Sequence, residues 1–464
     1  MRGLVRMGWG VVDQAVSSLT NFAVSFLLAH TLLPAQFGAF SLTYVTYGFV
    51  LTASRGISTD PLLVRYSGVE VSKWRRATGM ATGTAVVVGL IAGTLSLGLS
   101  FLLGQTNGRG FLALGLTLPG LMLQDSWRYA FFSMGRGKHA FLNDLIWGVV
   151  LLAGMAALRV THHTDVFWAV LVWGASACVA AAFGPWQAGV MPKVVDVWIW
   201  LRIQRDLGPR YLLEGTVSNS AYQIRAYATS GILGLAALGS LSASVTIFGP
   251  ITILLLAMGL VSTPEASRVL RRSPQRLTLF CVAISSAMSL IALLWGLTLL
   301  IGMPLGLGGI LLGSLWRPTY PLVLPSLVSA VAGMAGMGTG AVLHALGASR
   351  KTLKLAVFNT AIIVGFSLAG GLLLGGPGVV WGTSLAVLAG TIVSWWQLHV
   401  ALREANLPQA NIWSLFARFL PRRTPAAPEA TPVAIRPAMA TVPPPHQSPH
   451  QPAGRVAPRH RKQH

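Results

Sequence analysis

Two arginines interrupt long apolar runs of this sequence. Arg55 lies in the stretch 52–59 of mostly small and hydroxylated residues, and Arg225 lies beside Asn219 and Gln223 in a second polar stretch. A charged side chain within an apolar membrane-spanning helix costs roughly 2.5 to 3.5 kcal/mol on insertion scales, so each arginine should face a partner or a wet cavity. Because a guanidinium can bind a phosphate group through two parallel hydrogen bonds, the pattern predicts contacts with an anionic substrate. We expect Arg55 and Arg225 to face one cavity from opposite halves of the chain, with Asn219 and Gln223 beside Arg225.

Further ionisable residues offer alternatives to that ligand. Arg55 could instead form an ion pair with Asp60 or Asp13 that only fixes helix packing. Asp125 and Arg128 stand three residues apart in one apolar run. At that spacing opposite charges on one helix neutralise each other, so we expect a structural pair there.

Asp13 and Glu214 lie near the starts of their predicted helices. We expect both to be exposed, with a role in binding a coupling ion or relaying protons as the alternative. Glu214 is eleven residues from Arg225, about 16 Å along a helix, which excludes a direct pair within that helix. The sequence contains no P-loop, zinc motif or catalytic triad, so we expect no metal, no cofactor and no enzyme activity.

The composition indicates an integral membrane protein. Of the 464 residues, 53% are hydrophobic and only 10% are charged, and the mean hydropathy is +0.64, whereas a soluble globular chain carries about 25% charged residues. The formal charge of +22 arises from scarce acidic residues and from Arg clusters between apolar runs, which favours membrane topology over nucleic-acid binding. Both cysteines lie inside apolar runs, so a disulfide framework is not expected.

Apolar runs of about 20 residues, the length that crosses a bilayer, predict an all-α membrane protein of twelve helices. These helices cover residues 10–32, 38–62, 77–103, 111–134, 141–159, 166–185, 211–236, 240–262, 277–301, 319–346, 355–375 and 379–402. They divide into an N-terminal lobe, 1–186, and a C-terminal lobe, 210–402, joined by a cytoplasmic amphipathic linker, 187–209. The remaining residues, 403–464, are rich in proline and in basic residues and predict a disordered cytoplasmic tail.

Basic residues mark every second loop between the predicted helices. Three of them fall within spans, and three fall in the other set of loops, namely Arg109, Arg159 and Arg317. All remaining Lys and Arg residues lie on one side, so the positive-inside rule predicts that both termini are cytoplasmic.

Two faint repeats support an internal duplication. The end of the fourth helix, 133–135 followed by Lys138, recurs at the end of the tenth, 345–347 followed by Arg350. Asp13 near the start of the first helix recurs as Glu214 near the start of the seventh, with Gly38 and Gly239 farther on. Duplicated halves are a common construction of transporters, so we expect two pseudo-symmetric six-helix lobes.

Several segments resemble a known family. The opening 9–22, WGVVDQAVSSLTNF, and the segments 33–40, 54–66 and 346–350 are similar to Wzx-like polysaccharide flippases of the multidrug/oligosaccharidyl-lipid/polysaccharide exporter superfamily. The likeness extends over roughly residues 7–402, and the excess of Arg over Lys resembles actinobacterial members.

The resemblance implies a MATE-like alternating-access fold in the cytoplasmic membrane. Its cargo would be a polyprenyl-pyrophosphate-linked oligosaccharide, flipped to the outer leaflet for cell-surface polysaccharide biosynthesis. Arg55 carries over the role of a pyrophosphate contact by motif position, and Arg225 does so by helix position. Lipids of the bilayer and glycan-assembly proteins are the implied partners, and H⁺ or Na⁺ as a coupling ion stays open.

Other functions remain as alternatives. A multidrug and toxin extrusion (MATE) antiporter would need intramembrane carboxylates, and a lipid II flippase would differ in being essential for growth. A glycan polymerase would need a large outer loop with catalytic residues, whereas the longest predicted outer loop, 302–318, carries one charge, Arg317. A membrane scaffold would not require buried arginines.

Overall fold

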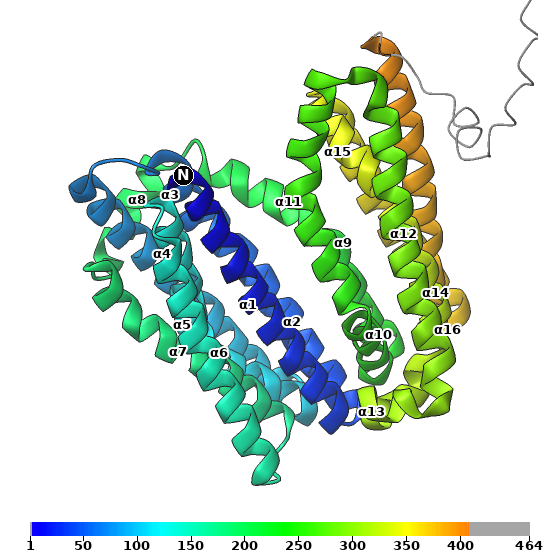
Figure 1. The fold of residues 1–464 in the computed structure, drawn as a ribbon. Coiled ribbons are helices and arrows are strands. Elements are labelled where there is room, and N and C mark those ends of the chain that lie inside the picture. Colours follow the sequence, from blue (N-terminus) through cyan, green and yellow to red (C-terminus); the bar gives the residue numbers. More distant parts are fainter. Residues whose placement is uncertain (1, 406, 408–464) are drawn as a thin grey trace, which may run out of the picture. The chain divides into compact units, whose positions relative to one another are not determined.

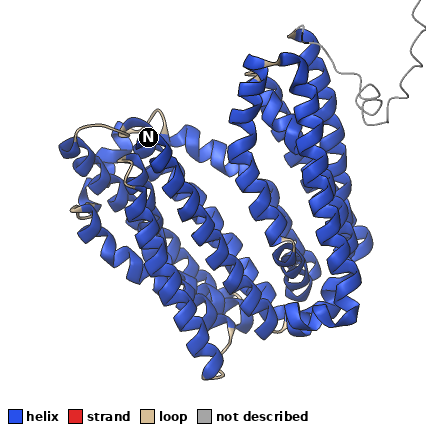
Figure 2. Ribbon diagram, in the orientation of Figure 1, coloured by secondary structure: helices blue, strands red, loops and turns tan. Residues whose placement is uncertain are grey.

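The computed structural model describes residues 2–405 and 407, and every regular element among them is helical (Figures 1 and 2). The predicted tail, 403–464, lies outside the described residues except at its first few positions. The side chains of Glu214 and Asn219 also lie outside the description.

The first half of the chain forms one group of helices. They are α1 (Arg2–Thr31), α2 (Pro34–Ser54), α3 (Asp60–Arg65), α4 (Val71–Leu102), α5 (Gln105–Ser133), α6 (Gly137–Val160) and α7 (Val166–Ala188). A π-helical turn, Arg55–Thr59, connects α2 to α3, so the two helices form one continuous rod that corresponds to the predicted helix 38–62.

The second half begins after a short helix, α8 (Val197–Ile203). It comprises α9 (Gly208–Leu233), α10 (Leu235–Ile247), α11 (Gly249–Arg272), α12 (Leu277–Gly302), α13 (Gly308–Leu312), α14 (Trp316–Ala335), α15 (Met337–Ala345) and α16 (Ser349–Glu404). The rods α10–α11, bent by 55°, and α14–α15 correspond to the predicted helices 240–262 and 319–346.

Helix α16 contains two predicted spans. Its 56 residues are interrupted at Gly375, where φ is 65° and ψ is −146°. A Cβ on Gly370 would lie 2.1 Å from the carbonyl oxygen of Gly378, so the two segments fold back on each other and pack backbone against backbone. Only glycine permits both the left-handed φ and this close approach.

Length and apolar composition identify five spanning stretches among the described residues, or six if the bent pair α10–α11 counts as one. The two longest, Pro274–Ala345 and Lys351–Glu404, contain 72 and 54 residues, far more than the about 20 that cross a bilayer once. Each reverses direction internally, at positive-φ glycines. The all-α architecture of two six-helix lobes predicted from the sequence is thereby confirmed.

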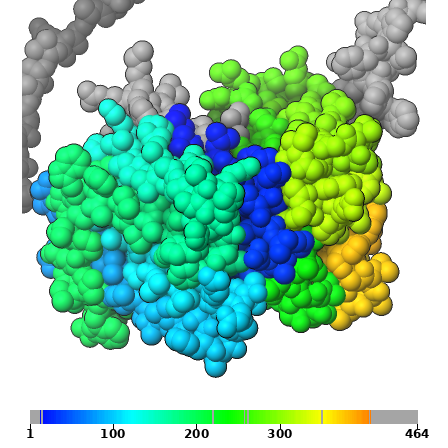
Figure 3. Space-filling model, turned by 90° about the horizontal axis from the view of Figure 1, so that it is seen from below, coloured from blue at the N-terminus to red at the C-terminus, as the bar shows by residue number. Residues whose placement is uncertain are grey.

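Within each half the helices pack through small residues. In the first half α5 packs against α4, α6 and α7, and in the second half α14 packs against α12 and α16. Figure 3 shows the surface of α1, in dark blue, between other first-half helices and the yellow-green second half, and α1 contacts both α6 and α13. Small residues allow this close packing in a membrane, where the hydrophobic effect does not drive helices together.

The repeated glycines meet where the halves join. A Cβ on Gly38 would lie 1.9 Å from the carbonyl oxygen of Leu235, and a Cβ on Gly239 would lie 2.1 Å from that of Pro34. Each glycine thus contacts the residue four positions before the other, which is the reciprocal pattern of a two-fold contact. Helices α2 and α10 therefore pack as equivalent elements of the two halves.

The linker is partly embedded in the first half. Trp200 of α8 is fully buried and its Nε1 donates to the carbonyl oxygen of Ile57 at 3.1 Å. Trp198, two residues earlier, is 72% exposed. Arg65 at the end of α3 donates to the carbonyl oxygen of Ile203 at 2.9 Å and forms an ion pair with Asp206. The amphipathic linker is thus tied by specific bonds to the end of the α2–α3 rod.

Candidate functional site

A polar cavity of about 480 Å³ lies among α1, α2, α5, α6 and α7 in the first half. Its walls carry Arg55, Asp125, Arg128 and Asp144. Six aromatic residues also line it: Tyr44, Tyr47, Tyr129, Phe132, Trp147 and Trp173. Ligand-binding cavities typically measure about 300 to 1,000 Å³ and combine apolar walls with a few polar groups, so both size and lining suit a ligand.

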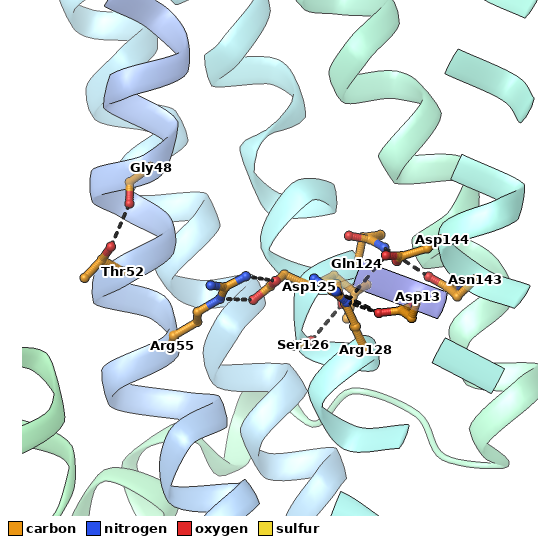
Figure 4. Close-up of polar contacts among 11 residues, drawn as sticks. Asp13, Gly48, Thr52, Arg55, Gln124, Asp125, Ser126, Arg128, Asn143 and Asp144 are labelled. Carbon is orange, nitrogen blue, oxygen red and sulfur yellow. Dashed lines mark hydrogen bonds and ion pairs between the residues drawn. The ribbon is translucent and has the colours of Figure 1, made fainter. Parts of the chain in front are cut away.

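Arg55 reaches across this cavity to Asp125 of α5 (Figure 4). Its Nε donates to Oδ2 at 2.9 Å and its Nη2 to Oδ1 at 2.6 Å, which is the bidentate geometry of a strong charge-assisted pair. The guanidinium also lies 4.9 Å from the centre of the Tyr129 ring. The Arg55 side chain is nevertheless 30% exposed, whereas that of Asp125 is 8% exposed.

The π-helical turn that begins at Arg55 helps to place this side chain. A π turn inserts an extra residue into a helix and shifts the direction of the side chains that follow. Such turns are rare and often occur at functional sites. The predicted alternative partner Asp60 starts α3, directly after the π turn, while the observed bidentate partner is Asp125.

Arg128 joins the neighbouring helices α1 and α6. Its Nε and Nη2 each approach Oδ2 of Asp13 at 2.7 Å, and its Nε lies 3.4 Å from Oδ2 of Asp144. Gln124 completes the group, because its Nε2 donates to Oδ1 of Asp144 at 2.8 Å. Figure 4 shows these side chains converging beside the Arg55–Asp125 pair.

Two predictions about these residues were wrong. Asp125 and Arg128 were expected to neutralise each other on one helix. Instead, Asp125 pairs with Arg55 of the π turn after α2, and Arg128 pairs with Asp13 of α1 and Asp144 of α6. Packing brings oppositely charged groups of other helices within reach of both. Asp13 was expected to be exposed but is completely buried, because the first helix continues well beyond it toward the N-terminus and α6 covers it.

We define the acid–base network as Asp13, Arg55, Asp125, Arg128 and Asp144. Its three carboxylates exceed its two guanidinium groups. Two of these carboxylates, Asp125 and Asp144, line the cavity together with both arginines, so the described walls are not a simple cationic surface. Asp144 belongs to the network although its position near a predicted helix start gave no sign of burial. Within the described part of the chain, no three His, Cys, Asp or Glu side chains are grouped to hold a metal ion.

Arg225 lies in a separate, smaller pocket of about 190 Å³ in the second half. Its Nη1 lies 3.3 Å from Oγ1 of Thr383, and its guanidinium lies 5.6 Å from the centre of the Tyr222 ring. Hydroxyl groups of Ser244 and Ser326 also line the pocket. The ion pairs found among the described side chains do not include Arg225, and its Nε has no hydrogen-bond partner there.

The predicted residues are therefore only partly brought together. Arg55 and Arg225 were expected to face one cavity, but in this structure they line two. Gln223 is buried and does not line the pocket of Arg225, because two residues along a helix point to nearly opposite sides. Asn219 and Glu214 lie where side chains are not described.

No family model matches the chain, and no curated protein matches its sequence. Solved structures match most of its length. The chain is similar to the inward-facing conformation of a multidrug resistance MATE family transporter of the MOP superfamily, with a TM-score of 0.65 and 16% identity over 85% of this chain and 99% of that one.

Two more solved structures support the same fold. The lipid II flippase MurJ in an inward closed conformation matches with a TM-score of 0.64 and 10% identity over 84% of this chain and 87% of that one. A MOP superfamily transporter from Pyrococcus furiosus, described as having a binding pocket of reversed polarity, matches with a TM-score of 0.53 and 18% identity over 86% and 95%. The chain has the fold of these transporters.

Proposed function

We propose that this chain is a membrane transporter that flips a polyprenyl-pyrophosphate-linked oligosaccharide from the cytoplasmic to the outer leaflet. The observation that carries the proposal is Arg55, a partly exposed guanidinium that the carboxylate of Asp125 holds over an aromatic-lined cavity. A pyrophosphate offers the same bidentate acceptor geometry as Asp125 and more negative charge. It can therefore replace the carboxylate on Arg55 without leaving the cation unpaired.

The cavity walls fit the glycan portion of such a substrate. Tyrosine and tryptophan present flat apolar faces to sugar rings and keep a polar group for the hydroxyls. Tyr47 and Trp173 stand edge to face with ring centres 4.8 Å apart, so these faces are fixed by packing. Arg225 in the second half serves as the other anion contact in this proposal, because its pocket supplies hydroxyl donors and no described carboxylate.

Orientation and partners follow from the same proposal. The lobes 1–186 and 210–402, joined by the linker 187–209, open alternately to the two sides of the cytoplasmic membrane. Both termini lie in the cytoplasm. Enzymes that assemble the lipid-linked glycan on that side are the expected partners. A coupling ion, H⁺ or Na⁺, would bind the excess carboxylate of the acid–base network, where Asp13 and Asp144 share Arg128.

A second candidate is an antiporter for cationic drugs. It is favoured by the three carboxylates of the acid–base network, which could bind a cation in place of the arginines. The similarity of the fold to that of a multidrug resistance MATE family transporter is consistent with this candidate. A lipid II flippase is the remaining alternative, and it predicts that depletion of the protein stops growth.

The test is accumulation of lipid-linked oligosaccharide in cells that depend on this chain for its export. Arg55→Ala and Arg225→Ala should each block export while membrane abundance stays normal, and Arg55→Lys should fail nearly as badly if bidentate geometry is needed. Arg109→Ala is the matched control, because Arg109 pairs with Asp165 at 2.7 Å outside both cavities. Normal export by both Ala variants, together with lost drug resistance, would support the antiporter instead.

A further inference from the structure

The hairpin formed by α11 and α12 carries a basic groove at its closed end. Arg268 and Arg272 come from the last turns of α11, and Arg276 comes from the short turn before α12. The groove encloses about 330 Å³. Its apolar part consists of Val269, Leu279, Phe280 and Ala283.

The lining residues follow a strict helical register. On α11 they are 265, 268, 269 and 272, and from the turn before α12 into α12 they are 276, 279, 280 and 283. Ser273, between the two sets, also lines the groove. Both sets have the spacing i, i+3, i+4, i+7, which places each set on one face of its helix. The groove is thus built from two facing stripes. Arg271 is adjacent in sequence but does not line it.

The groove carries a net positive charge. Arg268 donates from Nη1 to Oε2 of Glu265 at 2.8 Å, and these two side chains are 62% and 44% exposed. Glu265 therefore offsets Arg268, and the remaining charge of the described lining comes from Arg272 and Arg276. Arg272 ends α11 and Arg276 lies in the turn before α12, so the two positive charges come from either side of the connection between the helices.

We propose that this groove binds the headgroup of an anionic phospholipid. The groove lies at the adjoining ends of α11 and α12, and the ends of membrane-spanning helices lie near the lipid headgroups. Arg272 and Arg276 would hold the phosphate, while Leu279, Phe280 and Ala283, up to two helical turns deeper, would contact the glycerol and the first methylenes. The site requires that the chain spans a membrane, but it is independent of the transported substrate.

Native mass spectrometry of the full-length protein released from detergent tests this site. The protein is titrated with phosphatidylglycerol and, separately, with phosphatidylcholine of the same acyl chains. The double variant R272A/R276A should bind phosphatidylglycerol about 25-fold more weakly, at about fivefold for each guanidinium removed. R271A should bind as the wild type does. Glu265→Gln should bind about fivefold more tightly, because it releases Arg268.

Several results would overturn the proposal. An equal loss in R271A would mean that only the general surface charge matters, and equal retention of phosphatidylcholine would mean that the headgroup is not recognised. Inorganic phosphate that displaces the lipid at millimolar concentration would assign the pocket to a free anion. If the double variant does not fold, Arg272→Gln and Arg276→Gln are compared singly with Arg271→Gln. Lipid binding is measured without transport substrate, so this result does not depend on the proposed flippase activity.

Discussion

Replacing Asp125 with asparagine tests whether the Arg55–Asp125 pair belongs to a substrate site or is only a structural ion pair. Asparagine keeps the size of the side chain and one acceptor oxygen but removes the charge that Arg55 contacts. In the proposed mechanism Asp125 competes with the substrate for Arg55, so its neutralisation should strengthen binding of an anionic head group. If the pair only fixes α2 against α5, the same change should leave binding unchanged or weaken it.

The size of the effect follows from the pair's geometry and exposure. Two charge-assisted hydrogen bonds, at 2.9 and 2.6 Å, connect the groups. A buried bond to a charged group contributes about 1.5 to 3 kcal/mol and an exposed ion pair about 0 to 1 kcal/mol. Because the Arg55 side chain is 30% exposed, we take about 1 to 2 kcal/mol for the competition, which corresponds to about 5- to 30-fold tighter binding.

The assay is direct binding of farnesyl pyrophosphate to the purified protein, with farnesol as the uncharged reference. Asp125→Asn should lower the Kd for the pyrophosphate within the stated range and should leave farnesol binding unchanged. Asp165→Asn is the control, since it releases Arg109 at an exposed site outside the cavity. An unchanged or higher Kd for a monodisperse Asp125→Asn protein would refute the competition mechanism.

Three further predictions address packing, charge and topology. Gly38→Ala should lower the melting temperature, because its Cβ would collide with the backbone of α10. Gly48→Ala on the same helix is the control: its Cβ would have no neighbour within 4 Å, so it should be neutral or stabilising by up to about 1 kcal/mol. Arg128→Ala should destabilise the fold by about 3 to 5 kcal/mol, since it leaves two buried carboxylates without their cation; an unchanged melting temperature would contradict this. Reporters fused after Arg136 should be cytoplasmic and those after His163 external, and the reverse result would reject the twelve-helix topology.

The spans could be predicted because a bilayer leaves the backbone few choices. Every peptide group must be hydrogen-bonded within its own helix, so apolar runs of sufficient length become helices whatever their neighbours are. The predicted pair 355–375 and 379–402 illustrates this, since the structure has its break at Gly375, the last residue of the first predicted helix. The 55° bend between α10 and α11 falls just before Pro250, and its angle depends on packing that the local sequence does not specify.

The site could be predicted only in part, for the same physical reason. The cost of a charge in an apolar run identifies Arg55 and Arg225 without any knowledge of the fold. Their partners depend on how helices are rotated against one another, which local spacing does not specify. The spacing of Asp125 and Arg128 indicated an intrahelical pair, yet Asp125 pairs with Arg55 and Arg128 pairs with Asp13, both from other helical segments.

The two halves share backbone packing but differ in charge. Gly38 and Gly239 make reciprocal contacts, as duplicated halves should. In the first half, however, Arg55 is paired with Asp125, while in the second half Arg225 lies among hydroxyl groups. An anionic substrate would therefore meet no described competing carboxylate at Arg225 and would have to displace one at Arg55. Under the proposed function, this difference makes Arg225→Ala a defect of initial capture and Asp125→Asn a defect of release, so the two variants should change apparent affinity in opposite directions.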